Sequence, residues 1–432
     1  MKREILISGS QRETRVAILE DDRLVELLVD RPELSRSVGN IYRGKVEAVL
    51  PGIQAAFVDV GAEKSAFLHA SDLIEPDDED LDEEDNGKGT GPRGRSRLPN
   101  IQDAVKRGET ILVQVTKEPI STKGARVTTQ ISLPGRYLVY LPFASRVGVS
   151  RKIEARDERA RLRKTVKDLL PRSKSPGGVI VRTVAEDADR DQLKRELKSL
   201  LDVWRKIKRK ATFVRPPSLV QREASLTSGI IRDLFSEKVD RLWVDSKRVY
   251  NEIKAYLEPL DPDLLERTTL YADKVSLFDR FEIEDEIATL HQRRVDLPTG
   301  GYLVIELTEA LVSIDVNTGR YTGKKDPEKT ILRTNIEAAR EIARQLRLRD
   351  MGGIIVIDFI DMEVQGNRDR VLHELRTHLG RDRARTRAFG VSDLGLIEMT
   401  RQRVRPSLWQ SMTEPCPACG GLGNSQEFDP EL

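Results

Sequence analysis

Two stretches of sequence decide the predicted fold: YLVIELTEALVSIDVN at residues 302–317 and GGIIVIDFIDM at residues 352–362. The first has the alternation of two strands joined by a tight turn at Thr308 and Glu309, and the second reads as an apolar strand. The residues between them have helical spacing, and a helix of about 20 residues is long enough for a β-α-β crossover, which makes the flanking strands parallel. The expected elements are strands at 302–307, 311–316 and 354–360 and a helix at 328–348, capped by Asp326 with Pro327 in its first position.

Each of the two parallel strands carries one aspartate, Asp315 or Asp358. Side chains alternate along a strand, so Ser313, Asp315 and Asn317 project from one face. The carboxyl ends of parallel strands meet at one edge of a sheet, and we expect both aspartates there, in surroundings where an unpaired carboxylate is costly. Two carboxylates and an amide oxygen suit Mg²⁺, which could activate water for attack on a phosphate. In the alternative interpretation, Asp358 caps a turn and backbone donors satisfy Asp315.

Length and composition indicate a multidomain protein, because 432 residues with 38% apolar content exceed what one hydrophobic core usually organises. No apolar run reaches the length of a membrane-spanning helix, and the first residues, MKREILISGS, lack the apolar core of a signal peptide, so the default expectation is a cytoplasmic location. The two cysteines, Cys416 and Cys419, have the CxxC spacing of a metal or redox site rather than of a disulfide framework.

The formal net charge of +2 hides an uneven distribution. Nine of the eleven residues at 75–85 are acidic, and the rest of the chain has 73 basic against 62 acidic residues, an excess of 11. Basic clusters at 156–167, 205–215 and 381–405 favour a polyanionic partner. The alternative is that these clusters only solvate helix surfaces.

Outside the central motif, the chain begins with short alternating strands within residues 1–30. Further short strands at 38–73 and 110–132 predict a small barrel such as an OB-fold. Residues 75–99, acidic and then rich in Gly, Arg and Pro, interrupt that barrel as a disordered loop. Residues 136–257 alternate strands and helices in an α/β pattern.

The segments SIDVNTG (313–319) and RTNIEAAREIARQLRLRDMGGIIVIDFIDM (333–362) resemble the catalytic core of the ribonuclease E/G family. Similarity continues in VGNIYRGKVEAVLPGIQAAFVDVG (38–61) and CPACGG (416–421), and it extends over nearly the whole chain. The motifs FLHASDL, GYLVIELTEA and FGVSDLGLIEMTRQR are closest to the ribonuclease G branch of that family.

The resemblance implies a multidomain fold of α/β and α+β class. The implied domains are an RNase H-like domain at 1–36 and 227–290, an OB-fold RNA-binding domain at 37–133 with an acidic insertion at 75–99, a 5′-sensor domain at 134–226, a DNase I-like catalytic domain at 291–412, and a zinc-link with a tail at 413–432.

The implied function is Mg²⁺-dependent endonucleolytic hydrolysis of single-stranded RNA in rRNA processing and mRNA decay, leaving 5′-monophosphate products. By resemblance, the catalytic residues are Asp315 and Asp358, which bind Mg²⁺, and Asn317, which orients the site; RNA contacts come from Phe57, Phe67 and Lys123; and a 5′-monophosphate is sensed by Gly135, Val139, Arg182, Thr183 and Arg385. From the residues alone, Phe57 and Phe67 would be assigned to a hydrophobic core, and Arg182-Thr183 is a common dipeptide.

Zinc in a structural site needs four ligands, and one CxxC supplies two. The resemblance implies that Cys416 and Cys419 share a zinc ion with the same pair of a second chain in a homodimer, with a higher oligomer left open. A redox role is the alternative for the cysteines. For the whole protein, the alternatives are a non-catalytic RNA-binding or ribosome-assembly factor and a DNA nuclease.

Overall fold

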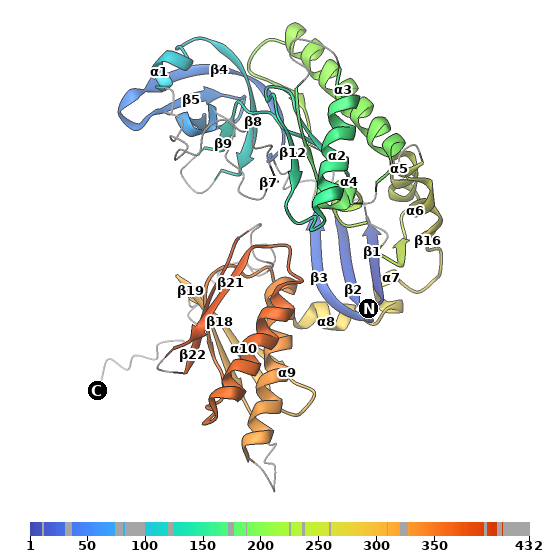
Figure 1. Ribbon diagram of the computed structural model, residues 1–432, viewed down its shortest axis with the longest axis vertical. Coiled ribbons are helices and arrows are strands. Elements are labelled where there is room, and N and C mark those ends of the chain that lie inside the picture. Colours follow the sequence, from blue (N-terminus) through green and yellow to red (C-terminus); the bar gives the residue numbers. More distant parts are fainter. Residues whose placement is uncertain are drawn as a thin grey trace, which may run out of the picture. The chain divides into compact units, whose positions relative to one another are not determined.

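The computed structural model forms two compact units: one from Met1–Ser8, Arg15–Val29 and Tyr271–Leu432, and one from Gly9–Thr14 and Asp30–Leu270 (Figure 1). The structure describes residues 1–10, 13–30, 37–73, 81–82, 100–119, 124–171, 177–186, 188–223, 226–235, 238–258, 261–308, 310–319, 327–392, 395–403 and 408. None of its described helices is both long enough and apolar enough to cross a membrane.

The first unit is built around a six-stranded sheet of order β17-β18-β19-β20-β22-β21. Its strands are β17 (Arg294–Asp296), β18 (Tyr302–Leu307), β19 (Leu311–Asn317), β20 (Gly353–Asp358), β21 (Thr386–Val391) and β22 (Leu396–Arg401). The β19–β20 pair is parallel and all other neighbours are antiparallel. The predicted crossover is therefore confirmed. Strand β20 ends at Asp358, two residues before the predicted end of that strand.

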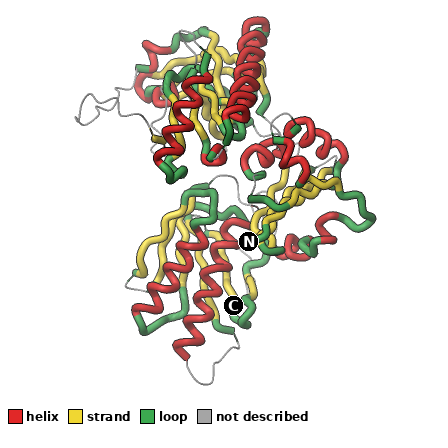
Figure 2. The backbone as a smooth tube through the Cα atoms, turned by 45° about the vertical axis from the view of Figure 1, so that its right-hand side comes forward, coloured by secondary structure: helices red, strands yellow, loops and turns green. Residues whose placement is uncertain are grey.

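The crossover helix α9 (Pro327–Leu348) starts at Pro327, as predicted, because proline suits the first helical turn. Asp326, its expected cap, lies outside the described residues. Helices α9 and α10 (Gln365–Leu379) lie side by side on one face of the sheet (Figures 1 and 2). Their apolar side chains meet the inward side chains of β19 and β20, such as Ile314 and Ile355, in one buried core.

Three N-terminal strands are joined to α9 by ion pairs, of which those of Arg347 are buried. They are β1 (Arg3–Gly9), β2 (Thr14–Glu20) and β3 (Arg23–Asp30), in that order. Arg347 of α9 lies 3.2 Å from both Glu20 and Glu26, and Arg23 lies 3.1 Å from Glu341. Two short helices, α7 (Leu277–Arg280) and α8 (Glu284–Thr289), complete the described secondary structure of this unit.

The second unit contains a closed five-stranded barrel, which confirms the predicted OB-like barrel. Its strands are β4 (Ile41–Leu50), β5 (Ala55–Asp59), β6 (Ala66–His69), β8 (Thr110–Lys117) and β9 (Arg126–Thr128), in the order β4-β5-β6-β9-β8, and β4 also pairs with β8. The barrel needs a glycine at Gly44, because a Cβ there would lie 2.5 Å from the Val58 side chain. Helix α1 (Ile101–Ala104) adds Ile101 to the barrel core.

A second sheet in this unit has the order β10-β11-β13-β12-β7 and packs against two helices. Its strands are β7 (Leu81–Asp82), β10 (Leu133–Pro134), β11 (Leu138–Leu141), β12 (Val147–Ser150) and β13 (Gly178–Val181), and the helices are α2 (Arg156–Leu169) and α3 (Arg190–Phe213). Strand β7 corrects the prediction that the whole acidic stretch is a disordered loop, since Leu81 and Asp82 pair with β12. The other residues at 75–99 lie outside the described part of the chain.

The remaining elements of this unit alternate strands and helices, as the sequence predicted. They are β14 (Ser218–Gln221), α4 (Leu226–Asp233), β15 (Arg241–Val244), α5 (Lys247–Leu257), α6 (Pro262–Glu266) and β16 (Thr268–Leu270). Strand β14 pairs with β4 of the barrel, and β15 is parallel to β16.

Candidate active site and nucleic-acid contacts

Asp315 and Asp358 are direct neighbours in the parallel pair of β19 and β20. Neighbouring strands lie about 4.8 Å apart in the hydrogen-bonding direction, and the side chains of register partners point to the same face of the sheet. Asn317 lies two residues after Asp315 on that face, and its side-chain nitrogen donates a hydrogen bond of 2.8 Å to Asp315 Oδ2. The structure thus brings together the three residues predicted to be catalytic.

Both aspartates are exposed, which corrects the prediction that they point into surroundings costly for a carboxylate. The reason is that α9 and α10 pack on the opposite face, where Val312, Ile314 and Val316 are buried. On the face of the aspartates even Ile354 is 53% exposed. Burial cost therefore does not explain the pair.

The electrostatics of the pair are unfavourable in the protein alone. Partial burial, the charge of Asp315 and the charge of Asp361 raise the pKa of Asp358 above its ordinary value. Among the described residues, no Lys or Arg forms an ion pair with Asp315 or Asp358. The two carboxylates are thus a place of concentrated negative charge on an accessible surface, which attracts a cation.

The donor set fits Mg²⁺, which typically takes one or two protein carboxylates and keeps sites for water and phosphate oxygens. Within the described residues there is no cluster of three or more His, Cys, Asp or Glu side chains that could enclose a metal ion. An open site of two carboxylates, Asp315 and Asp358, is therefore the form that the structure offers. Asp361, which acts on Asp358, was not singled out from the sequence, although its spacing in the motif IDFID was visible.

Phe57 and Phe67 form an aromatic pair on the barrel. They are register partners on β5 and β6 with ring centroids 6.0 Å apart, and His69 stacks on Phe67 at 6.3 Å. Both phenylalanines are partly exposed, while Ala56, Val58, Ala66 and Leu68 on alternate positions are buried. Their assignment to the core, made from the residues alone, is wrong, because alternation turns them away from the barrel interior. His69 was missed, although it follows Phe67 at the i+2 spacing of a strand face.

Four of the five predicted 5′-sensor residues gather at one end of the β11–β13 pair. Arg182 directly follows β13, and its Nη1 donates a hydrogen bond of 2.8 Å to the Gly135 carbonyl. Val139 is the register partner of Ile180, and Thr183 Oγ1 lies 3.0 Å from Ser150 Oγ. The fifth residue, Arg385, belongs to the other unit, directly before β21.

A carboxylate that the sequence did not reveal, Asp233 at the end of α4, lies 2.6 Å from Arg182 Nη1. A second one, Glu196 of α3, is buried and accepts hydrogen bonds from the backbone nitrogens of Arg136, Tyr137 and Leu138 at 2.5–2.8 Å. Neither could be predicted, because both come from helices far along the chain from Gly135.

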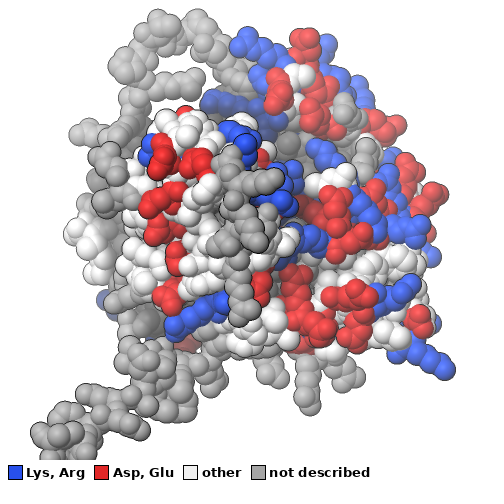
Figure 3. Space-filling view, turned by 90° about the horizontal axis from the view of Figure 1, so that it is seen from below, with Lys and Arg blue, Asp and Glu red and all other residues white. Residues whose placement is uncertain are grey.

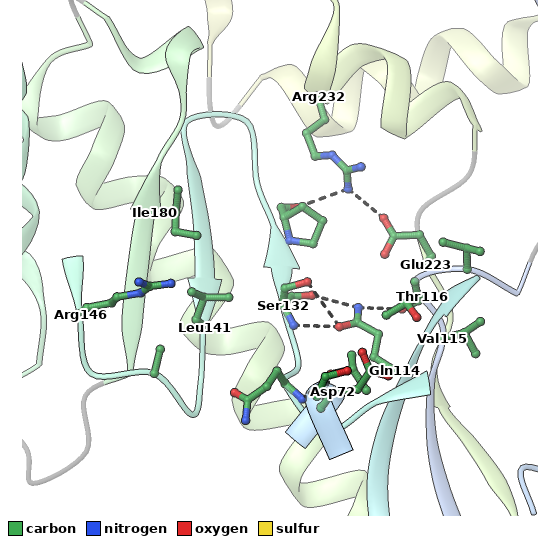
Figure 4. Close-up of a pocket in the computed structure, with 17 residues that line it drawn as sticks. Asp72, Gln114, Val115, Thr116, Ser132, Leu141, Arg146, Ile180, Glu223 and Arg232 are labelled. Carbon is green, nitrogen blue, oxygen red and sulfur yellow. Dashed lines mark hydrogen bonds and ion pairs between the residues drawn. The ribbon is translucent and has the colours of Figure 1, made fainter. Parts of the chain in front are cut away.

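A cavity of about 580 Å³ lies between the barrel and the β11–β13 strands of the same unit (Figure 4). Gln114 of β8 stabilises its wall by donating to the Gly39 and Ser132 carbonyls at 3.0 Å. Arg232 and Glu223 form an ion pair of 2.9 Å at another part of its lining. The cavity was not predicted, since its walls come from segments distant in sequence.

Charge on the molecular surface is mixed. On the face in Figure 3, Lys and Arg are interspersed with Asp and Glu, without one continuous basic area in the atoms shown. Within α2, the predicted basic cluster at 156–167, Arg161 is paired with Glu158 at 2.5 Å. Lys123, Cys416 and Cys419 lie outside the described residues.

A closed OB-like barrel and an α/β unit with two adjacent carboxylates on an exposed sheet face define an architecture suited to an enzyme that acts on nucleic acid. A model described as "Ribonuclease E/G family" matches residues 132–404. Ribonuclease G of Haemophilus influenzae is 42% identical over 97% of this chain and 83% of its own length, and ribonuclease G of Escherichia coli K12 is 42% identical over 98% and 84%. Ribonuclease E of H. influenzae is 39% identical over 99% of this chain but 44% of its own length.

The chain therefore belongs to the ribonuclease E/G family, and it is an endoribonuclease, a hydrolase of RNA. The resemblance inferred from the motifs is confirmed.

Proposed function

We propose that the protein hydrolyses phosphodiester bonds of single-stranded RNA in a Mg²⁺-dependent reaction and leaves a 5′-monophosphate on the downstream product. The observation that carries this proposal is the direct register pairing of Asp315 with Asp358 on an exposed sheet face. Membership in the ribonuclease E/G family supports RNA as the substrate. A protein that only binds RNA has no need for two adjacent carboxylates without a basic partner.

In this mechanism Asp315 and Asp358 hold the cation, and Asn317 fixes the orientation of the Asp315 carboxylate through its 2.8 Å hydrogen bond. Held by these carboxylates, a divalent cation would supply Lewis-acid chemistry, activating water and neutralising charge on the phosphate. Because the carboxylates lie on an exposed face, single-stranded RNA can reach them without a rearrangement of the sheet.

Phe57 and Phe67 hold unpaired bases by stacking. Both rings are partly exposed and held side by side, which suits a binding mode that tolerates different sequences. Arg182 and Thr183, with Gly135 and Val139, bind a 5′-monophosphate, and an arginine fork with a hydroxyl is a suitable phosphate ligand. For Arg385, which belongs to the other unit, the phosphate contact stays a prediction from the resemblance. By the resemblance, Lys123, which lies outside the described residues, adds a further RNA contact.

The central test is cleavage of an end-labelled A/U-rich oligoribonucleotide with Mg²⁺, with EDTA, and with matched DNA as competitor. We expect cleavage with Mg²⁺ only, RNA preferred over DNA, and a product that carries a 5′-phosphate. Cleavage that persists in EDTA would refute the metal dependence, and equal cleavage of DNA would refute the substrate.

Two copies of the chain form a homodimer in which Cys416 and Cys419 of each copy share one zinc ion. The argument is ligand number, because a structural zinc site takes four ligands and CxxC offers two. Sedimentation of the wild type and of Cys416→Ser tests it: loss of zinc should yield monomers, and a dimer that persists without zinc contradicts it.

The physiological setting that fits this activity is rRNA processing and mRNA decay in the cytoplasm. Sequencing of RNA 5′ ends in cells with and without the gene tests it. Unchanged rRNA precursors and unchanged mRNA half-lives would contradict this role.

A further inference from the structure

The guanidinium of Arg182 is held at one of its three nitrogens. Nη1 donates to the Gly135 carbonyl at 2.8 Å and lies 2.6 Å from Asp233 Oδ1. Among the described residues, these two contacts account for the hydrogen bonds and ion pairs of the group, and both use Nη1; the buried Glu196 also acts on Arg182 through its charge. The Nε and Nη2 donors form the other edge of the planar fork, which is the edge that binds two oxygens of a phosphate or carboxylate.

Asp233 is itself fixed by a second arginine. Arg232 donates from Nε to Asp233 Oδ1 at 3.3 Å and from Nη2 to Oδ2 at 3.2 Å. Its Nη1 lies 2.9 Å from Glu223 and 3.4 Å from the Pro134 carbonyl (Figure 4). Arg232 and Arg182 therefore hold the carbonyls of two consecutive residues, Pro134 and Gly135.

The charges of this group are balanced so that Asp233 stays ionised. Burial alone would raise the pKa of Asp233, but the charges and hydrogen bonds of Arg182 and Arg232 outweigh it and lower that pKa. The two arginines, Arg182 and Arg232, meet two carboxylates, Asp233 and Glu223, so the four charges balance. Asp233 thus fixes Arg182 through Nη1, and what Arg182 offers an anion is the pair of donors on its Nε–Nη2 edge.

The same network is anchored to the barrel and to the turn after Gly135. The Glu223 nitrogen donates to Asn40 Oδ1 at 2.8 Å, and Asn40 directly precedes β4. At the turn, a Cβ on Gly135 would lie 2.8 Å from Glu196, so glycine lets that carboxylate approach. The partners of Arg182 are therefore held in place from two sides.

We propose that Asp233 is a positioning residue of the 5′-phosphate site: it holds Arg182 by Nη1 so that the Nε–Nη2 edge is already aligned for the terminal phosphate of the RNA. This inference rests on the proposed 5′-end sensing and adds a residue that acts through Arg182. The phosphate then meets a preformed fork and loses less binding free energy to ordering of the side chain.

The test measures kcat/KM for two oligoribonucleotides that differ only in a 5′-monophosphate or a 5′-hydroxyl, and takes their ratio. Asp233→Asn should lower the ratio by roughly 5-fold, since a partly exposed charged contact is lost. Asp233→Glu should restore part of it. The double variant Arg182→Gln/Asp233→Asn should have the same ratio as Arg182→Gln alone, because Asp233 acts through Arg182.

Asp202→Asn is the matched control. Asp202 forms an ion pair with Arg205 on the surface of α3 in the same unit, and its loss should leave the ratio unchanged. Thermal unfolding of each variant shows whether it is folded; if Asp233→Asn is not, Asp233→Glu carries the test with an intermediate ratio.

The outcomes separate the inference from the proposed sensing. If Arg182→Gln leaves the ratio unchanged, the sensing fails and the role of Asp233 fails with it. If Arg182→Gln lowers the ratio but Asp233→Asn does not, or raises it, only the role of Asp233 is overturned. An equal loss of activity on both RNAs in Asp233→Asn would also overturn it, because that is the effect of a structural residue.

Discussion

Asp315 and Asp358 lie next to each other on an exposed sheet face with no basic partner among the described residues, whereas Arg182 in the other unit has both Asp233 and the Gly135 carbonyl on one nitrogen. The first group is left with excess charge, and the second is compensated within the protein. Uncompensated carboxylates need a cation from solution, while a compensated arginine is aligned before its ligand arrives. We therefore expect the proposed reaction centre to depend on a bound cation and the proposed recognition site to depend on preorganisation.

The variant Asp358→Asn tests most directly whether cleavage needs the carboxylate pair, and it should have the largest effect. Loss of one of two metal-binding carboxylates should lower kcat by about 1000-fold or more, because the charge that holds the cation is halved. Single-turnover cleavage measures kcat, and an RNA-binding assay should give an unchanged Kd. Asp296→Asn on β17, an exposed aspartate paired with Arg294 in the same sheet, is the control. Metal-dependent cleavage at the wild-type rate by Asp358→Asn contradicts the assignment.

Recognition by the barrel is tested by Phe67→Ala. Loss of one stacking ring should weaken binding of single-stranded RNA by about 10-fold, with little change in Tm, because the ring is partly exposed and Leu68 forms the core. Phe213, which is 81% exposed at the end of α3, provides the matched control Phe213→Ala. Equal effects of the two variants on the Kd would show that the barrel ring has no specific role.

The variant Thr183→Val tests whether the threonine hydroxyl contributes to the proposed 5′-phosphate site. The loss of one hydroxyl near Arg182 should lower the preference for 5′-monophosphate over 5′-hydroxyl RNA by about 3-fold, the size of one hydrogen bond. Thr212→Val, on the surface of α3, should not change the preference. A preference that stays at the wild-type value in both variants would remove Thr183 from the site.

The smallest expected effect is on the pH dependence of stability. One buried glutamate in each unit has a shifted pKa, and the two pKa shifts have opposite signs. Burial raises the pKa of Glu341 in α9, but Arg344 outweighs it and the pKa is lowered. Glu341 therefore stabilises the fold above the ordinary glutamate pKa of about 4.3, and this stabilisation is lost as pH falls below it. In Glu341→Gln the loss of Tm relative to wild type should shrink as pH falls towards 3.

Glu196 has the opposite sign, because burial raises its pKa more than its three backbone donors lower it. The folded protein binds that proton more tightly than the unfolded chain, so Glu196 destabilises the fold increasingly as pH rises above about 4.3. The Tm of Glu196→Gln minus the Tm of the wild type should therefore increase from pH 4 to pH 7. Parallel pH profiles of Tm for wild type, Glu341→Gln and Glu196→Gln would contradict both signs.

Much of the central sheet could be predicted from local patterns. The alternation at 302–317, the apolar strand ending at Asp358 and the proline at the start of α9 gave the strands, the helix and the parallel pairing. The exposure of the aspartates could not be predicted in the same way. Alternation separates the two faces of a strand, but which face α9 and α10 cover depends on how the helices pack.

The recognition residues show the same limit more strongly. The Arg182-Thr183 dipeptide carries little information by itself, and its partners Asp233 and Glu196 come from α4 and α3. Phe57 and Phe67 looked like core residues because aromatic side chains in apolar strands usually are. Their true position follows only from the closure of the barrel, which fills its interior with the residues on the alternate positions.

The sequence by itself determined the family, the β-α-β crossover and the two aspartates that it brings to one sheet edge, because strand and helix periods and chain connectivity are local properties. The tertiary structure alone decided that these aspartates are exposed, that the phenylalanines leave the core, and that Asp233 joins Arg182. The physical reason is that burial and charge partners depend on which surfaces meet, and the segments that meet here lie tens of residues apart in the chain.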